Sequence, residues 1–182
     1  MNERILQQGI QGEEQFQSWL EEHGVPFIRL ADSISKFFPT PYKIPKNVRL
    51  PDYLISIDGG VIVDVKNQSD HNEHVEDGIT RLSQPECTGL LGFWSVFRIP
   101  TFVVFVTPTA FLWTTPGWVR ANGTIHRQMF PGKDGKRRRY FEFPTSGLVQ
   151  IERSGSPLTC LETLRQLPGW TFCAEDATGT EA

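Results

Sequence analysis

The stretch from Arg49 to Gln68 constrains the fold of this chain more than any other part of its sequence. Two short runs rich in β-branched and aromatic residues, Tyr53 to Ile57 and Val61 to Val65, flank the sequence Asp-Gly-Gly. Such runs favour β-strands, and glycine accepts the positive φ angles of a tight turn without a steric penalty. The stretch therefore predicts a β-hairpin.

The alternation of polar and apolar residues predicts the register of this hairpin. A three-residue Asp-Gly-Gly loop pairs Leu54 with Asp64 and Asp52 with Lys66, whereas a two-residue Gly-Gly loop would put the two aspartates on opposite faces. We expect the three-residue loop, because it separates the faces cleanly. One face is then wholly apolar, and the other carries Asp52, Leu54, Ser56, Ile62, Asp64 and Lys66.

Two carboxylates and a lysine at one end of a hairpin have a chemical interpretation. Mg²⁺ usually takes one or two protein carboxylates together with water and substrate phosphate. A nearby ammonium group can orient a water molecule or neutralise developing negative charge. The alternative is a surface hairpin with solvated charges, because short motifs also occur by chance.

Length, charge and cysteine content narrow the class of protein. The 182 residues predict a single domain over residues 1–173, followed by a disordered tail over residues 174–182. The net charge of −3 means that any nucleic-acid contact must be local. Three scattered cysteines and a polar N-terminus favour the cytoplasm. No apolar run approaches the ~20 residues that span a bilayer, so no membrane contact is expected.

The N-terminal segment predicts a helix over Ile5 to His23, which Gly24 would end. Glu13 lies three and seven positions before Phe16 and Leu20, at the edge of the apolar stripe. We expect Glu13 to point toward the hairpin site, with Glu14 as the alternative. A strand is expected over Val25 to Leu30.

Two loops beside the hairpin supply further polar groups. The proline-rich segment 31–48 and the residue after it contain bases among aromatic residues, a combination that can bind phosphates and stack bases, although a solvated loop explains it equally well. The bases are Lys36, Lys43, Lys46 and Arg49. Gln68 continues the polar face of the hairpin, where it would help to hold a water molecule or a phosphate.

The second half of the chain predicts a helix that leads into the core. Gly78 to Phe97 is expected to be helical, with an interruption at Pro85. Thr101 to Thr107 is almost continuously apolar, which is typical of a strand covered on both faces. A helix followed by such a strand predicts a crossover packed on the sheet. Another strand is expected over Ala110 to Thr115.

A second hairpin, over Gly123 to Phe130 and Arg138 to Phe143, is expected to contain the most basic patch of the chain. Like-charged runs are usually solvated loops, but beside a phosphodiester site this patch fits backbone phosphate contact. A short helix over Leu158 to Leu167 would follow. The patch consists of Lys133, Lys136, Arg137, Arg138 and Arg139.

The hairpin residues resemble the signature of the PD-(D/E)xK nuclease superfamily. Pro51-Asp52 is followed, twelve positions after Asp52, by Asp64-Val65-Lys66. The helix around Glu13 and the helix and strand after the hairpin occur in the order of this superfamily's αβββαβ core, over residues 5–107. The ordering is similar to that of Holliday-junction resolvases and nuclease-related domains. The resemblance implies a restriction-endonuclease-like α/β fold, with a mixed central sheet flanked by helices.

The resemblance also implies an activity. Asp52 and Asp64, the Val65 carbonyl and Glu13 would ligate Mg²⁺, for which Mn²⁺ could substitute, and Lys66 would position or activate the attacking water. The chain would then be a metal-dependent deoxyribonuclease, expected to act as an endonuclease. DNA would be its partner, with a homodimer or the subunits of a larger complex as further partners. The alternative is a nuclease fold without catalysis that serves as a DNA-binding or assembly subunit.

Overall fold

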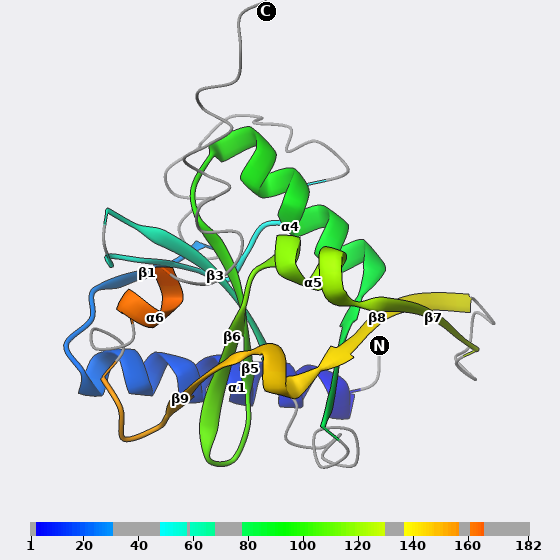
Figure 1. Ribbon diagram of the computed structural model, residues 1–182. Coiled ribbons are helices and arrows are strands. Elements are labelled where there is room, and N and C mark those ends of the chain that lie inside the picture. Colours follow the sequence, from blue (N-terminus) through cyan, green and yellow to red (C-terminus); the bar gives the residue numbers. More distant parts are fainter. Residues whose placement is uncertain are drawn as a thin grey trace, which may run out of the picture.

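The central element of the structure is a six-stranded mixed sheet with the strand order β1-β2-β3-β5-β6-β9 (Figure 1). The computed structural model describes residues 3–30, 48–57, 59–67, 78–129, 137–156 and 161–165. Strands β3 and β5 run parallel, and every other neighbouring pair runs antiparallel. The strands are β1 (Phe27–Arg29), β2 (Tyr53–Ile55), β3 (Val61–Asn67), β5 (Thr101–Val106), β6 (Ala110–Thr114) and β9 (Val149–Glu152).

Helices cover both faces of this sheet. Helix α1 (Glu3–Glu22) packs Phe16, Trp19 and Leu20 against one face, together with Leu164 of the short helix α6 (Leu161–Arg165). Helices α4 (Gln84–Phe97) and α5 (Pro116–Asn122) cover the other face. Figure 1 shows α1 and α4 on opposite sides of the sheet. No helix in the described ranges is both long enough and apolar enough to cross a membrane.

A second sheet of three strands extends from the α4 side. Its order is β4-β8-β7, with β4 (Ile79–Ser83), β7 (Thr124–Met129) and β8 (Arg137–Pro144) all antiparallel. Leu82, Phe141 and Phe143 pack its inner face against α4 and β5. The predicted second hairpin is confirmed as β7 and β8, and the 3₁₀ turn η1 (Thr145–Gly147) connects it to β9.

The αβββαβ order predicted from the sequence is confirmed in the main sheet by α1, β1, β2, β3, α4 and β5. Strand β5 is buried along its whole length, as its apolar run predicts. Strand β9 was not predicted; its alternating sequence Val-Gln-Ile-Glu pairs with β6.

The predicted helix over Gly78 to Phe97 is wrong in its first part. Residues Ile79–Ser83 form strand β4, in which Thr80 and Leu82 are buried. These residues alternate with period two, and their partner strand β8 lies about sixty residues later in the chain. The helix begins at Gln84, because the Ser83 side chain caps it and a proline occupies its first turn.

The predicted loop of the first hairpin is also wrong. Tyr53 pairs with Val63 and Ile55 with Val61, so the loop spans residues 56–60 instead of three residues. Local turn hydrogen bonds follow the last pair of the ladder: the Ile57 amide donates to the Ile55 carbonyl at 3.0 Å, and the Gly60 amide donates to the Ile57 carbonyl at 2.8 Å. The slip is two residues, so every side chain keeps its predicted face.

Candidate active site

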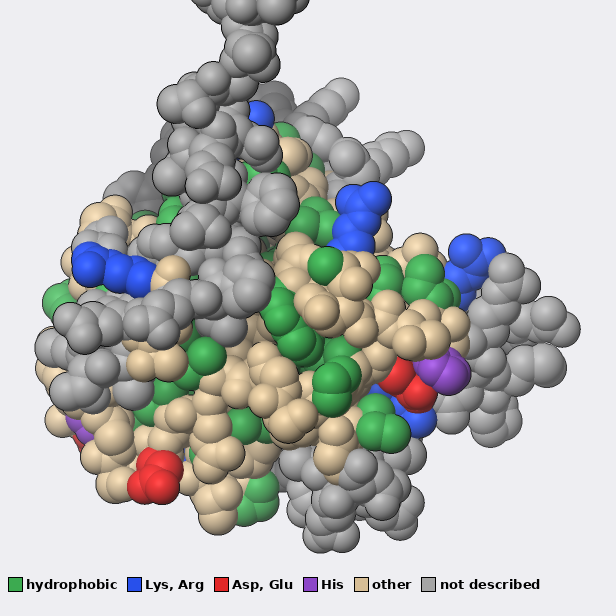
Figure 2. All heavy atoms as spheres, viewed as in Figure 1, with side chains coloured by type: hydrophobic (Ala, Val, Ile, Leu, Met, Phe, Trp, Pro, Cys, Tyr) green, Lys and Arg blue, Asp and Glu red, His purple; other side chains and the backbone are tan. Residues whose placement is uncertain are grey.

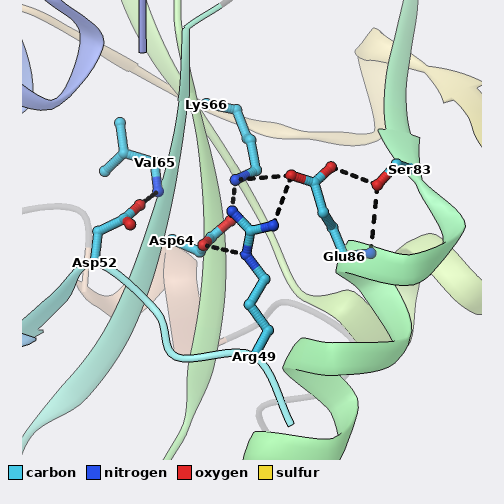
Figure 3. A network of polar contacts seen from close by, with 7 residues as sticks. All are labelled: Arg49, Asp52, Asp64, Val65, Lys66, Ser83 and Glu86. Atoms are coloured by element: carbon cyan, nitrogen blue, oxygen red, sulfur yellow. Dashed lines mark hydrogen bonds and ion pairs between the residues drawn. The ribbon is translucent and has the colours of Figure 1, made fainter. Parts of the chain in front are cut away.

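The two aspartates of the hairpin lie on neighbouring segments of the chain. Asp52 directly precedes β2, and its backbone amide donates to the Val63 carbonyl at 3.1 Å, so the predicted pairing of Asp52 with Lys66 is wrong. The backbone amide of Val65 donates to Oδ2 of Asp52 at 2.6 Å. In Figure 3 the Asp52 carboxylate points at the Val65 backbone, and the Asp64 and Lys66 side chains extend toward α4. The hairpin therefore brings three of the predicted site residues together.

Asp64 belongs to a ring of four ion pairs on the α4 side of β3, together with Lys66, Glu86 and Arg49 (Figure 3). The carboxylate is fully buried, and its Oδ2 lies 2.6 Å from Nζ of Lys66. Its Oδ1 lies 3.4 Å from Nε of Arg49. Glu86 closes the ring through its Oε1, which lies 2.9 Å from Nη1 of Arg49 and 3.4 Å from Nζ of Lys66. Two cations thus face two carboxylates.

The electrostatics of Asp52 show that this ring leaves it under-neutralised. Burial raises the pKa of Asp52 to about 7, and the negative charges of Asp64 and Glu13 add to this effect. The Lys66 ammonium and the Val65 amide lower the pKa but do not restore its ordinary value. A carboxyl group whose pKa is raised by burial and by a neighbouring negative charge is characteristic of functional sites.

The other members of the ring are held in their charged forms. Burial lowers the pKa of Lys66, but the Asp64 and Glu86 carboxylates outweigh this and raise it overall. The pKa of Arg49 is raised in the same way, by Asp64 and Glu86 against burial. Burial raises the pKa of Glu86, but Lys66, Arg49 and a hydrogen bond from Ser83 lower it overall.

Sequence reasoning missed Glu86, and it placed Arg49 among the loop bases that can bind phosphates instead of beside the two aspartates. The signal for Glu86 is the sequence Ser-Gln-Pro-Glu, a capping box in which Ser83 caps the helix and contacts Glu86 in return. It was hidden because the whole segment was predicted as helix. Arg49 lies only three positions before Asp52, a proximity to the signature that marks it as a candidate.

A divalent cation fits the residues at this site. Oδ2 of Asp64 is buried, and it has no hydrogen-bond partner of regular geometry among the described residues besides its ion pair with Lys66. No cluster of three or more acidic, histidine or cysteine side chains occurs within the described ranges. Mg²⁺ commonly binds through only one or two carboxylates, so a pair such as Asp52 and Asp64 is compatible with its chemistry, and their roles as ligands remain predictions.

Glu13 lies near this site but is bound elsewhere. Its Oε2 is 2.7 Å from Nη2 of Arg29 on β1, and its carbonyl accepts a hydrogen bond from the Tyr53 hydroxyl at 3.1 Å. Its neighbour Gly12 packs so closely on β3 that an added Cβ would lie 2.6 Å from Cβ of Asn67. The metal-ligand roles of Glu13 and of the Val65 carbonyl remain predictions. Glu14 lines a separate surface pocket with Arg153.

The predicted nucleic-acid contacts are only partly visible. Lys43, Lys46, Lys133, Lys136 and Gln68 lie outside the described residues, as does the predicted tail 174–182. Arg137 and Arg138 lie on β8, and the exposed side chain of Arg139 follows them. The described lysines and arginines on the face in Figure 2 are scattered, so no large basic patch appears there.

The basic end of β8 is connected to the active site through the second sheet. Tyr140 pairs with Ser83 of β4, and Ser83 contacts Glu86 at 2.6 Å. Arg139 is the next residue along β8, where it pairs with Arg127 of β7. The predicted phosphate contacts of β8 therefore begin one residue from Tyr140, whose partner Ser83 contacts Glu86.

The topology and the hairpin site together define the class of fold. The αβββαβ order, the mixed sheet covered by helices on both faces and the Asp52, Asp64 and Lys66 side chains at neighbouring strand ends form a restriction-endonuclease-like fold. This order of elements is the one that the PD-(D/E)xK signature predicts.

Comparison with known proteins adds one structural likeness. No family model matches the chain, and no curated protein matches it. The chain is similar to the solved structure of Hjc, a Holliday junction resolvase from the archaeal hyperthermophile Archaeoglobus fulgidus. The two are 17% identical, the TM-score is 0.46, and the likeness covers 79% of this chain and 91% of that chain.

Proposed function

We propose that this chain is a metal-dependent deoxyribonuclease that hydrolyses phosphodiester bonds as an endonuclease. The observation that carries the proposal is the buried Asp64, which contacts Lys66 at 2.6 Å and whose charge, after burial, contributes to the raised pKa of the neighbouring Asp52. Buried like charges held close together oppose burial, and such arrangements cluster at functional sites. A purely structural hairpin gains nothing from such an arrangement.

Each residue has a proposed role. Asp52 and Asp64, with the Val65 carbonyl and Glu13, would hold Mg²⁺ or Mn²⁺. When bound, the cation stabilises the negative charge on the transferring phosphoryl group. Lys66, which its carboxylate neighbours keep protonated, orients the attacking water. The water oxygen attacks phosphorus in line and loses a proton to solvent, the bond to the leaving oxygen breaks, and the leaving oxygen takes up a proton from solvent. The basic end of β8 would contact the DNA backbone.

A cleavage panel tests this proposal. Linear, nicked, branched and single-stranded DNA would be incubated with Mg²⁺ and either the wild type or Asp64→Asn, which keeps the size of the buried side chain. We expect cleavage of at least one DNA by the wild type and none by the variant, and a Mg²⁺-induced rise in Tm for the wild type alone. Mg²⁺-dependent cleavage by a pure Asp64→Asn preparation would contradict the proposal.

One observation favours a second candidate function, a non-catalytic DNA-binding or assembly subunit. Arg49 and Lys66 already neutralise Asp64 and Glu86, so the ring of ion pairs is complete without a cation. A wild type that binds DNA but cleaves none with Mg²⁺ or Mn²⁺ supports this candidate. Cleavage that appears only after addition of a partner protein would instead identify the catalytic subunit of a larger complex.

A further inference from the structure

Arg49 is held in place at both ends by one face of helix α4. Its backbone amide donates to the carbonyl of Gly89 at 3.0 Å, and its Nη1 lies 2.9 Å from Oε1 of Glu86. Glu86 and Gly89 are three residues apart and so share a face of the helix. An added Cβ at Gly89 would lie 2.6 Å from Cβ of Arg49, so the absence of a side chain permits this approach.

The guanidinium group itself is only partly used. Its contact with Asp64 is long, at 3.4 Å, and the Arg49 side chain is 40% exposed, whereas Asp64 is fully buried. Within the described part of the chain, no hydrogen bond or ion pair uses its Nη2 atom. A guanidinium held on one edge by a carboxylate keeps donors in a fixed plane for another acceptor.

We propose that Arg49 binds a backbone phosphate of the DNA at the cleavage site, and that Glu86 and Gly89 position it for this contact. The inference rests on the proposed nuclease function and assigns a substrate-binding residue to it. Planar guanidinium groups match phosphate oxygens bidentately, and the location beside Asp64 and Lys66 is where the reacting phosphate must lie. The alternative is that Arg49 acts as a plug, which means that its guanidinium group competes with the cation for Asp64. In that case the loss of the Arg49 charge would raise activity instead of weakening DNA binding.

DNA binding by Arg49→Gln tests the proposal without any cleavage step. Fluorescently labelled linear and branched DNA would be titrated with the full chain by anisotropy, with Ca²⁺ replacing Mg²⁺, at several salt concentrations. We expect the Kd to rise about tenfold, because a charged hydrogen bond is lost. The slope of log K against log salt should become shallower by about 0.9, the value for one phosphate contact.

The matched control is Arg98→Gln, which removes the same charge from the opposite end of α4. Arg98 is exposed at the C-terminal cap of that helix and stacks on Trp94. We expect its DNA affinity and salt slope to equal those of the wild type. Equal binding by Arg49→Gln and Arg98→Gln would overturn the proposal, as would faster cleavage by Arg49→Gln at limiting Mg²⁺, which indicates a plug.

A double-mutant cycle tests the positioning role of Glu86. Glu86→Gln keeps the size of the side chain but loses its charge, so we expect weaker DNA binding in the wild-type background and no further loss in the Arg49→Gln background. Equal losses in both backgrounds would show that Glu86 acts through general stability instead.

The outcomes separate this inference from the proposed function. A wild type that cleaves DNA while Arg49→Gln binds normally overturns only the inference. If the wild type cleaves nothing, but Arg49→Gln binds DNA more weakly and with a shallower salt slope, the phosphate contact is supported and the nuclease proposal is overturned. A wild type that binds none of the DNAs overturns both.

Discussion

The two faces of strand β3 have opposite characters. Val61, Val63 and Val65 point toward α1 and are almost completely buried in a cluster of apolar residues. On the other face, beneath α4, Asp64 is fully buried and the side chain of Lys66 is 18% exposed, and both are charged. One strand therefore serves two purposes: its α1 face stabilises the fold, and its α4 face holds charges that oppose burial.

The largest expected effect breaks the apolar face. Phe16 of α1 is fully buried and contacts four aromatic rings. Phe16→Ala should lower the free energy of unfolding by about 4 kcal/mol, through lost burial and the cavity that remains. Urea denaturation measures this, with Phe16→Leu as a control that loses less. A loss below about 1 kcal/mol would mean that α1 is not the main support of this face.

The next effect acts on the charged face alone. Lys66→Met should reduce cleavage about 100-fold, equivalent to about 2.7 kcal/mol of transition-state stabilisation. The methionine keeps much of the packing of the lysine stem, so the secondary structure seen by circular dichroism should persist. Steady-state cleavage under saturating Mg²⁺ measures the loss. Normal cleavage by this variant would remove Lys66 from the mechanism.

A smaller effect concerns the pH dependence of stability in metal-free buffer. The native state holds a proton on Asp52 up to about pH 7, whereas an unfolded chain releases it near pH 4, so the free energy of unfolding falls as pH rises between them. Asp52→Asn removes this loss and should be more stable than the wild type at pH 8 by on the order of 1 kcal/mol.

Thermal unfolding from pH 4 to 8 checks this prediction, and the two proteins should converge at the acidic end. Adding Mg²⁺ at pH 8 should stabilise the wild type more than Asp52→Asn. A wild type that gains stability relative to the variant between pH 4 and 7 would contradict the shifted pKa.

The smallest effect tests the helix that faces the charges. Ser83→Ala removes the cap of α4, which should cost about 0.5 to 1 kcal/mol in the free energy of unfolding. Because Ser83 also contacts Glu86, cleavage should fall as well, whereas Thr115→Ala, at the cap of α5, should affect stability alone. Similar effects of both variants on cleavage would show that Ser83 acts only as a helix cap and has no role at the candidate site.

The sequence predicted the features that depend on local alternation. It failed for the length of the hairpin loop and for strand β4, whose partner strand is distant in the chain. The period of two in β3 assigns Asp64 and Lys66 to one face, whatever the loop length. The loop length instead depends on turn hydrogen bonds, from the Ile57 amide to the Ile55 carbonyl and from the Gly60 amide to the Ile57 carbonyl, which the alternation does not specify. Strand β4 forms because β8 pairs with it, and its outer face bears Arg81 bonded to Glu142.

The candidate site divides in the same way. Asp52, Asp64 and Lys66 follow from one short stretch of sequence. Glu86 belongs to helix α4, whose start was missed because strand β4 before it was predicted as part of the same helix. Arg49 was visible beside the signature, but its role depends on α4 packing, which a single sequence does not specify.

The close approach of Gly12 to Asn67 limits how far the end of β3, and with it Lys66, can shift relative to α1. With only a hydrogen atom at that position, α1 rests directly on the last residue of β3, one position after Lys66. A catalytic group must be held within about 0.5 Å of its working position. Even the smallest side chain at Gly12 would push the helix and the strand end apart by more than that margin, so a methyl group at this distance could misalign the lysine without touching it.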